Sequence, residues 1–298
     1  MKIFRTLGTL LPVAFAIALA LGRLDAQAAQ PKCSSCEVWN TPQNPFRIYG
    51  NTYYVGPHGL SSILIASPAG HILIDGALPE SASQIEDHLR GLGFRLEDVK
   101  VILSSHVHFD HAGGIAELQR LTGATVMASP WSASVLEKGG VGAGDPQYGE
   151  IRGIEKVANV KMLHDGETVR VGSLALTAHF TPGHTPGGTS WTWQSCEGDR
   201  CYNMVYADSV SAVSADNFKF SHDAHAVQDF EKTFAFLDTV LCDVLLTAHP
   251  EVADLWDRMK QRRAGAKPDP LVNPGQCREL AALGRQQLQQ RIAKETVK

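Results

Sequence analysis

Short apolar runs separated by turn residues predict the strands of this chain. Residues 63–65 and 71–75 are rich in β-branched residues and leucine, and Pro-Ala-Gly at 68–70 favours a hairpin between them. Residues 99–103 form another apolar run, long enough for a buried strand but too short for a helix. Similar patterns predict strands at residues 125–127, 160–163, 168–171, 174–180, 189–193, 204–207 and 244–247.

Helical periodicity lies between these strands. Residues 81–92 have it, and Gly93 follows as a C-cap. Residues 139–149 are rich in glycine and contain Pro146, which predicts a long surface loop. The other helices are expected at residues 113–121, 130–138, 227–240, 252–263 and 278–293. Strands followed by helices in both halves predict an α/β fold in which helices cover two face-to-face sheets, a four-layer αββα sandwich.

The N-terminus has the features of a secretory signal. Lys2 and Arg5 precede an apolar run at residues 10–21, and the small residues of Ala-Gln-Ala at 26–28 match a cleavage site. The apolar run is shorter than the ~20 residues that span a bilayer, so no membrane anchor is expected. We predict a signal peptide over residues 1–28, a single domain over residues 29–298, and a periplasmic location.

The charge balance restricts the possible partners. The chain has 27 basic and 31 acidic residues, a formal net charge of −4. This balance provides no positive field for phosphate backbones, so a nucleic-acid partner is not expected. The expected partners are small molecules, and the expected oligomeric state is a monomer.

All six cysteines lie in the exported part, where thiols tend to be oxidised. Six cysteines allow fifteen pairings, so their connectivity is open. A Cys196–Cys201 bridge would close a turn of sequence Glu-Gly-Asp-Arg, and a Cys242–Cys277 bridge would then tie a core strand to the C-terminal helix. Cys33 and Cys36 remain, either as a strained CxxC bridge or as two flexible thiols.

A histidine-rich turn directly follows the apolar run at residues 99–103. It contains His106, His108, Asp110 and His111, so three imidazoles and one carboxylate lie within six residues. Alternation along an extended chain places the first two on the same side. Burying so many polar groups unpaired would be costly, whereas imidazole with carboxylate suits zinc. The turn therefore predicts a zinc site.

Two further histidines follow predicted strands. His184 lies in the turn-rich segment Thr-Pro-Gly-His-Thr-Pro-Gly-Gly, and His249 lies in Ala-His-Pro after the strand at 244–247. Loops at strand ends often carry binding and catalytic residues. A lone histidine is more often structural, but the same placement occurring twice beside a strong cluster favours two more ligands.

These motifs together resemble the metallo-β-lactamase superfamily over essentially the whole exported part. Narrower features resemble subclass B3 β-lactamases: Tyr49-Gly50-Asn51-Thr52, the segment 183–191, Ala207-Asp208-Ser209 and His249-Pro250. The resemblance implies β-lactam antibiotics as substrates, namely penicillins, cephalosporins and carbapenems. It also implies two zinc ions, the first bound by His106, His108 and His184 and the second by Asp110, His111 and His249.

The resemblance further implies how such a site would work. Three ligands on each zinc leave open positions, as catalytic zinc requires. Zinc lowers the pKa of its water to ~7, so a zinc-bound hydroxide can attack the lactam carbonyl at neutral pH. Asp110 would help to orient that nucleophile and is the expected catalytic residue.

Substrate contacts are implied by the same resemblance. Ser209 and Ser211 match serines that bind the substrate carboxylate, and Gln147 matches a glutamine that some B3 enzymes place over the metals. The alternatives are serines that only satisfy local backbone groups and a solvated glutamine. Asp208 matches an aspartate that bridges both metals in thioesterase and lactonase relatives but is not a main ligand in B3 enzymes. Its role stays open.

Three functions remain. The first is a B3 β-lactamase, the second is another hydrolase of the same fold, such as a lactonase or thioesterase, and the third is a non-enzymatic zinc-binding periplasmic protein. Open metal positions and a signal peptide favour the two hydrolases.

Overall fold

Two β-sheets form the centre of the fold in the computed structural model, which describes residues 1–2 and 31–296. The first sheet has the strand order β1-β2-β3-β4-β5-β6-β7, and the second has the order β12-β11-β10-β9-β8. Strands β1 to β4 pair antiparallel, and β4 to β7 pair parallel. Strands β8 to β11 form an antiparallel meander, to which β12 adds in parallel.

The strands are β1 (Phe46–Tyr49), β2 (Thr52–Tyr54), β3 (Ile63–Ile65), β4 (His71–Ile74), β5 (Val99–Leu103), β6 (Thr125–Ala128), β7 (Lys161–Met162), β8 (Thr168–Val171), β9 (Leu174–Phe180), β10 (Thr189–Glu197), β11 (Arg200–Ala207) and β12 (Val244–Thr247). The α-helices are α1 (Cys36–Trp39), α2 (Ala82–Gly91), α3 (Phe109–Ala112), α4 (Ile115–Thr122), α5 (Pro130–Lys138), α6 (Ala224–Thr239), α7 (Leu255–Arg263) and α8 (Gln276–Thr296). Short 3₁₀ turns are η1 (Pro79–Ser81), η2 (Leu96–Asp98), η3 (Phe220–His222) and η4 (Pro250–Ala253).

The first sheet is buried on both faces. Ile63 and Ile65 of β3 belong to the core between the two sheets, whereas Leu64 belongs to the core beneath the helices. Successive side chains of a strand point to opposite faces, so one strand contributes to both cores. This double burial explains why the sequence shows a continuous apolar run here instead of an alternating pattern.

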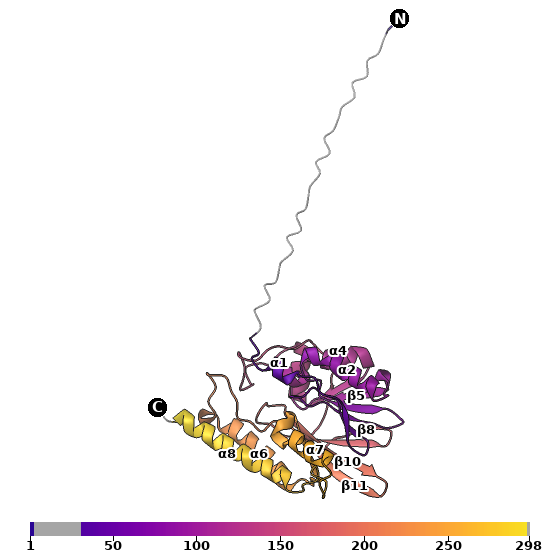
Figure 1. The fold of residues 1–298 in the computed structure, drawn as a ribbon. Coiled ribbons are helices and arrows are strands. Elements are labelled where there is room, and N and C mark those ends of the chain that lie inside the picture. Colours follow the sequence, from indigo (N-terminus) through magenta and orange to yellow (C-terminus); the bar gives the residue numbers. More distant parts are fainter. Residues whose placement is uncertain (3–30, 297–298) are drawn as a thin grey trace. The chain divides into compact units, whose positions relative to one another are not determined.

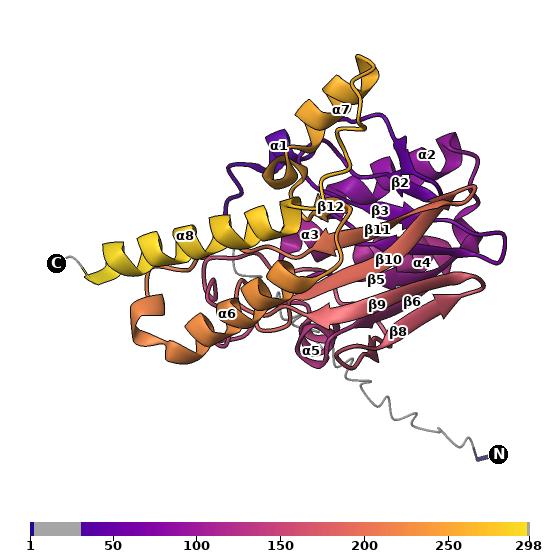
Figure 2. The same cartoon turned by 90° about the horizontal axis from the view of Figure 1, so that it is seen from below.

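Helices cover the outer face of each sheet. Ile85 of α2 and Leu118 of α4 pack against the first sheet, and Phe234 of α6 and Leu280 of α8 pack against the second. Figure 1 shows α2 and α4 on one side of the strands and α6 and α8 on the other. In Figure 2, α6 and α8 lie next to each other over the second sheet. The predicted four-layer αββα sandwich is confirmed.

Several element boundaries differ from the predicted ones. Strands β1 and β2 were not predicted, because both are short and are joined by a tight turn at Gly50, whose φ is 51°. The strand predicted at residues 160–163 is limited to Lys161–Met162. The helix predicted at residues 252–263 begins only at Leu255, because Asp254 has a φ of 49° and interrupts helical geometry.

The N-terminal predictions concern residues that the structure does not describe. The predicted signal peptide, residues 1–28, and its cleavage site lie almost entirely outside the described residues. By their contacts, residues Pro31–Lys298 form one compact unit. A search of the described helices found none that is long and apolar enough to cross a membrane.

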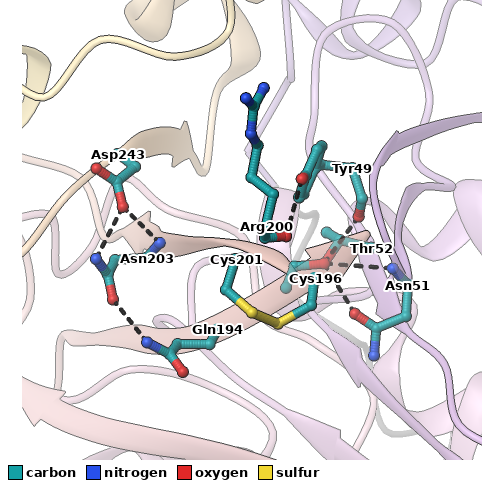
Figure 3. The surroundings of a disulfide bond; sticks show 10 residues. Tyr49, Asn51, Thr52, Gln194, Cys196, Arg200, Cys201, Asn203 and Asp243 are labelled. Atoms are coloured by element: carbon teal, nitrogen blue, oxygen red, sulfur yellow. Dashed lines mark hydrogen bonds between the residues drawn. A yellow bond between two sulfur atoms is a disulfide. The ribbon is translucent and has the colours of Figure 1, made fainter. Parts of the chain in front are cut away.

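Three disulfides are present: Cys33–Cys36, Cys196–Cys201 and Cys242–Cys277. The two predicted bridges are confirmed, and the CxxC cysteines form the third. Figure 3 shows Cys196–Cys201 near the end of the β10–β11 hairpin, close to Tyr49 of β1 and to Asn51 in the turn between β1 and β2. This hairpin is longer than predicted, because paired backbone continues through the polar residues and past the disulfide to Glu197 and Arg200.

We expect the Cys242–Cys277 disulfide to stabilise the fold more than Cys196–Cys201. The cysteines are 35 residues apart in the first pair and 5 apart in the second. On the chain-entropy model, loops of these lengths stabilise the folded state by about 4 and about 2 kcal/mol. Denaturant unfolding of the two double Cys→Ala variants measures both losses. Equal losses would contradict the expectation.

Candidate metal centre

The predicted site residues gather where strands of both sheets end. The turn after β5 comes from the first sheet, and the loops after β9, β11 and β12 come from the second. Strands β9, β11 and β12 run in the same direction, so their carboxyl ends share one edge. The Thr189 N–H donates to the Ser105 carbonyl at 2.8 Å, which joins the two sheets at this edge.

A buried aspartate holds the beginning of the histidine-rich turn. Asp75 is fully buried directly after β4, and it accepts hydrogen bonds from the Ser105 N–H at 2.7 Å and the Ser105 hydroxyl at 2.6 Å. The Tyr206 hydroxyl of β11 donates to the same carboxylate at 2.7 Å. Burial raises the pKa of Asp75, and His111 and these hydrogen bonds oppose that shift. Asp75 therefore anchors the turn to both sheets.

Three imidazoles converge beyond this anchor. One nitrogen each of His106, His108 and His184 lies within 4.8 Å of the others, and all three residues are buried. The Nε2 atom of His106 is buried without any hydrogen-bond partner. Burial and then the neighbouring His108 lower the pKa of His184 to about 3, so its ring is neutral. A neutral imidazole is the form that binds a metal ion.

Each of these rings also makes a hydrogen bond through one of its two nitrogens. The hydrogen bonds join His106 Nδ1 to Asp208 (2.7 Å), His108 Nε2 to Asp145 (3.2 Å), and His184 Nδ1 to the backbone carbonyl of Ser211 (2.9 Å). A ring nitrogen that donates a proton to a carboxylate or carbonyl leaves the opposite nitrogen with a free lone pair. The opposite nitrogens, Nε2 of His106, Nδ1 of His108 and Nε2 of His184, are therefore the ones that could bind a metal ion.

A second group lies beside the first. Ligand atoms of His106, Asp110 and His111 are within 4.8 Å of one another. The Nε2 atoms of His111 and His249 are 3.3 Å apart, and an Asp110 oxygen lies 3.2 and 3.4 Å from them. Burial acts to raise the pKa of Asp110, but His111 and His249 outweigh it and hold that pKa well below its usual value.

The donor set fits a metal ion. A bare imidazole nitrogen without a partner is costly when buried, and His106 has one. The facing ring nitrogens of His111 and His249 cannot both be satisfied by hydrogen bonding to each other. A cation bound between these nitrogens and the Asp110 carboxylate would satisfy all three groups. The structure brings all six predicted ligands together, namely His106, His108, Asp110, His111, His184 and His249.

The predicted substrate residues lie around this centre. Ser209 and Ser211 line a cavity of about 340 Å³ together with His249 and with Leu280 and Leu283 of α8. The Ser211 hydroxyl also lies 3.2 Å from His184 Nδ1.

Gln147 lies next to His108, with its amide nitrogen 3.4 Å from His108 Nδ1. The loop that carries it was predicted to lie on the surface. That is wrong for Asp145 and Pro146, which are buried because the Asp145 carboxylate reaches in to His108.

Asp208 lies behind His106. Its side chain is fully buried, and its Oδ1 contacts Nδ1 of His106, on the opposite side of the ring from Nε2. Burial raises the pKa of this carboxyl well above its usual value. Gly188 packs so closely that a Cβ atom there would lie 2.3 Å from the other Asp208 oxygen. Asp208 thus orients an imidazole in this structure.

The site and the fold agree with known proteins. The model of the metallo-β-lactamase superfamily matches residues 55–197. The crystal structure of MEM-A1, a subclass B3 metallo-β-lactamase isolated from a soil metagenome library, is 51% identical in sequence and has a TM-score of 0.84. The match covers 86% of this chain and 98% of MEM-A1. The chain belongs to the metallo-β-lactamase superfamily.

Other members of the superfamily match to different extents. Rm3 metallo-β-lactamase is 52% identical, with a TM-score of 0.86, and the match covers 89% of this chain and 99% of that one. A hydroxyacylglutathione hydrolase from Methylococcus capsulatus is 31% identical over 129 residues, which are 43% of this chain. The chain spans only 41% of the length of that curated relative. The predicted resemblance to subclass B3 metallo-β-lactamases is confirmed.

Sequence reasoning missed three residues that hold the site. Asp145 and Asp75 were not recognised, although an acidic residue at the end of a buried strand or before a proline in a glycine-rich loop is a usable signal. Gly59 was also missed, and its backbone carbonyl lies 3.2 Å from Nδ1 of His249. Every residue has a backbone carbonyl, so the residue type gives no indication of such a contact.

Proposed function

We propose that this protein is a dinuclear zinc β-lactamase that hydrolyses the amide bond of β-lactam antibiotics. One observation supports this proposal most strongly. Two groups of buried imidazole and carboxylate atoms share one centre, in a chain that is 51% identical to a subclass B3 metallo-β-lactamase over 98% of that structure.

The proposal assigns the six ligands to two zinc ions. The first would be bound by His106, His108 and His184, and the second by Asp110, His111 and His249. Imidazole and carboxylate are ligands that zinc prefers, and three per ion leave positions for water and substrate. When bound, zinc supplies a Lewis acid and a water whose pKa is near 7.

The chain's own residues would then orient the reactants. Asp110 is the proposed catalytic residue, because its carboxylate is ionised and lies beside both His111 and His249. In this position it can orient the attacking water toward the lactam carbonyl. Gln147 contacts His108 through its amide nitrogen, and the same amide can donate to the substrate.

Ser209 and Ser211 are proposed to bind the carboxylate that penicillins, cephalosporins and carbapenems carry beside the lactam nitrogen. Both line the cavity next to His249, and hydroxyls can donate to a charged acceptor. The cavity extends to α8, where Leu280 and Leu283 line it, and Glu251 and Asp254 line it as well.

Replacing both serines should weaken substrate binding more than it slows turnover. Hydrogen bonds to a charged group contribute about 1.5–3 kcal/mol each, and these would form in the bound ground state and persist in the transition state. We expect Ser209→Ala with Ser211→Ala to raise KM for penicillins and carbapenems about 10-fold or more. Zinc content should not change, because the backbone carbonyl of Ser211 still accepts from His184.

The control for this double variant is a β-lactam that lacks the carboxylate. Steady-state kinetics with that substrate should match the parent protein. Equal damage to both substrates would mean that the serines support the metal centre, and unchanged kinetics would mean that they have only a structural role.

A second candidate is another hydrolase of the fold, such as a lactonase or thioesterase. In those relatives an aspartate at the position of Asp208 bridges the metals, whereas here its Oδ1 contacts Nδ1 of His106, behind the ring. This contact favours the β-lactamase.

The experiment that separates the candidates compares three substrates on the zinc-loaded protein: a chromogenic cephalosporin, a lactone and a thioester. Hydrolysis of the cephalosporin above the other two is expected. Hydrolysis of the lactone or thioester alone would overturn the proposal, and hydrolysis of none would indicate a zinc-binding protein without activity.

We also propose that the protein acts in the periplasm after removal of residues 1–28. The N-terminal pattern supports this location, and so do three disulfides, which persist in oxidising compartments. Mass spectrometry of the protein secreted from a bacterial host measures the cleavage site. The expected monomer stays a prediction.

A further inference from the structure

Asp145 is a buried carboxylate that the proposed reaction does not use directly. Its side chain has no exposed surface, and its oxygens lie 3.2 and 3.3 Å from Nε2 of His108. It comes from the loop between α5 and β7, 37 residues away in sequence from that histidine. A buried carboxylate with a single imidazole partner needs further hydrogen bonds to offset its desolvation.

The second partner of Asp145 lies in its own loop. Its Oδ1 accepts a hydrogen bond from the backbone N–H of Gln147 at 2.8 Å, which closes a turn around Pro146. The same carboxylate therefore holds the ring of a proposed ligand and the backbone of a proposed substrate residue. The amide of Gln147 consequently lies 3.4 Å from Nδ1 of His108.

The turn also makes a hydrogen bond to the loop after β11. The carbonyl of Pro146 accepts a hydrogen bond from the N–H of Ala215 at 2.8 Å. Ala215 is buried and lies in the loop after β11 that carries Ser209 and Ser211. Two residues, Asp145 and Pro146, thus connect a metal-binding imidazole with both substrate-binding loops.

We propose that Asp145 is a positioning residue, which orients His108 toward the first metal and holds Gln147 in place beside that imidazole. This inference rests on the proposed function, because it assigns His108 and Gln147 their roles. Because Nε2 donates to Asp145, the lone pair of His108 is on Nδ1, the nitrogen that the Gln147 amide contacts and that would bind the first metal. Because Asp145 closes the turn, it fixes the backbone of Gln147 and thus the point from which the Gln147 side chain extends.

Three substitutions separate these two tasks. Asp145→Asn keeps one oxygen that can accept from both His108 and Gln147. Asp145→Ser has a hydroxyl that can close the turn with the Gln147 N–H but is too short to reach His108. Asp145→Ala loses both contacts. If the alanine variant fails to fold, the comparison of the asparagine and serine variants still tests the positioning of His108.

The chain offers a matched control in Asp269. Its carboxylate also accepts from a backbone N–H two residues on, that of Leu271 at 3.0 Å, in a turn around Pro270. Asp269 pairs with Arg262 and lies outside the metal centre. Asp269→Ala therefore measures the general cost of opening such a turn.

Zinc affinity and kinetics are the two measurements. Competition with a chromophoric chelator gives zinc affinity without reference to activity, and the visible spectrum of the cobalt-substituted protein reports on the ligand geometry. Loss of a hydrogen-bond partner behind a metal ligand lowers metal affinity about 10–100-fold. We expect that loss in the serine and alanine variants, and near-parent affinity in the asparagine and Asp269→Ala variants.

The kinetic measurement tests the second task. At saturating zinc, KM for a cephalosporin should rise in Asp145→Ala but stay near the parent value in Asp145→Ser, since only alanine opens the turn. Parent-like zinc affinity in Asp145→Ser, or affinity lost equally in Asp145→Asn, would overturn the positioning of His108. A parent-like KM in Asp145→Ala would overturn the positioning of Gln147. If the parent binds zinc tightly but hydrolyses no β-lactam, the proposed function fails, whereas the zinc affinities still test the contact with His108.

Discussion

Removal of the metal should abolish β-lactam hydrolysis, and added zinc should restore it. Around the centre the structure places imidazoles and carboxylates, and two serine hydroxyls of the described residues contact its histidines: Ser211 lies 3.2 Å from His184 Nδ1, and Ser105 lies 3.4 Å from His106 Nδ1. Neither ring nitrogen is a free base for a hydroxyl, because His184 Nδ1 donates to the Ser211 carbonyl at 2.9 Å and His106 Nδ1 donates to Asp208 at 2.7 Å. Neither hydroxyl is therefore activated as a nucleophile when the metal is removed.

Dialysis against a chelator, followed by titration with zinc, tests this prediction. The measured quantity is the rate of hydrolysis of a chromogenic cephalosporin. Activity should return in proportion to bound zinc. Inhibitors of the clavulanate type, which need a nucleophilic serine, should have no effect. Full turnover by protein that is verified to be metal-free would exclude the proposed chemistry.

The variant Asp110→Ala should lower kcat by about 10²-fold or more while the fold survives. Asp110 contacts both His111 and His249, so its removal takes away a proposed ligand of the second zinc and the group that orients the water. Rates at saturating substrate and the zinc content per chain are the measurements.

A matched control for this variant is Asp229→Ala. Asp229 is also a buried carboxylate that contacts a histidine, His225, together with Lys232 on α6. Its replacement should leave kcat and zinc content unchanged. Turnover and zinc content that both stay at parent values in Asp110→Ala would show that the ligand is assigned to the wrong residue.

The layers of the fold and the candidate ligands could be predicted from the sequence. Strands buried on both faces must be apolar throughout, so β3, β4 and β5 were visible as continuous runs. The histidine-rich turn was visible because four ligand-type residues lie within six positions, a density that packing alone does not favour. Strands β1 and β2 are only four and three residues long, too short to show such a pattern, and were missed.

The groups that hydrogen-bond to the far side of each ligand could be identified only in the folded protein. His106 contacts Asp208 across 102 residues of sequence, His108 contacts Asp145 across 37, and His249 contacts a backbone carbonyl across 190. These pairs depend on which strand ends share an edge, and strand order is not encoded in local periodicity. The backbone carbonyls of Gly59 and Ser211 are independent of residue type, so no sequence pattern could reveal them.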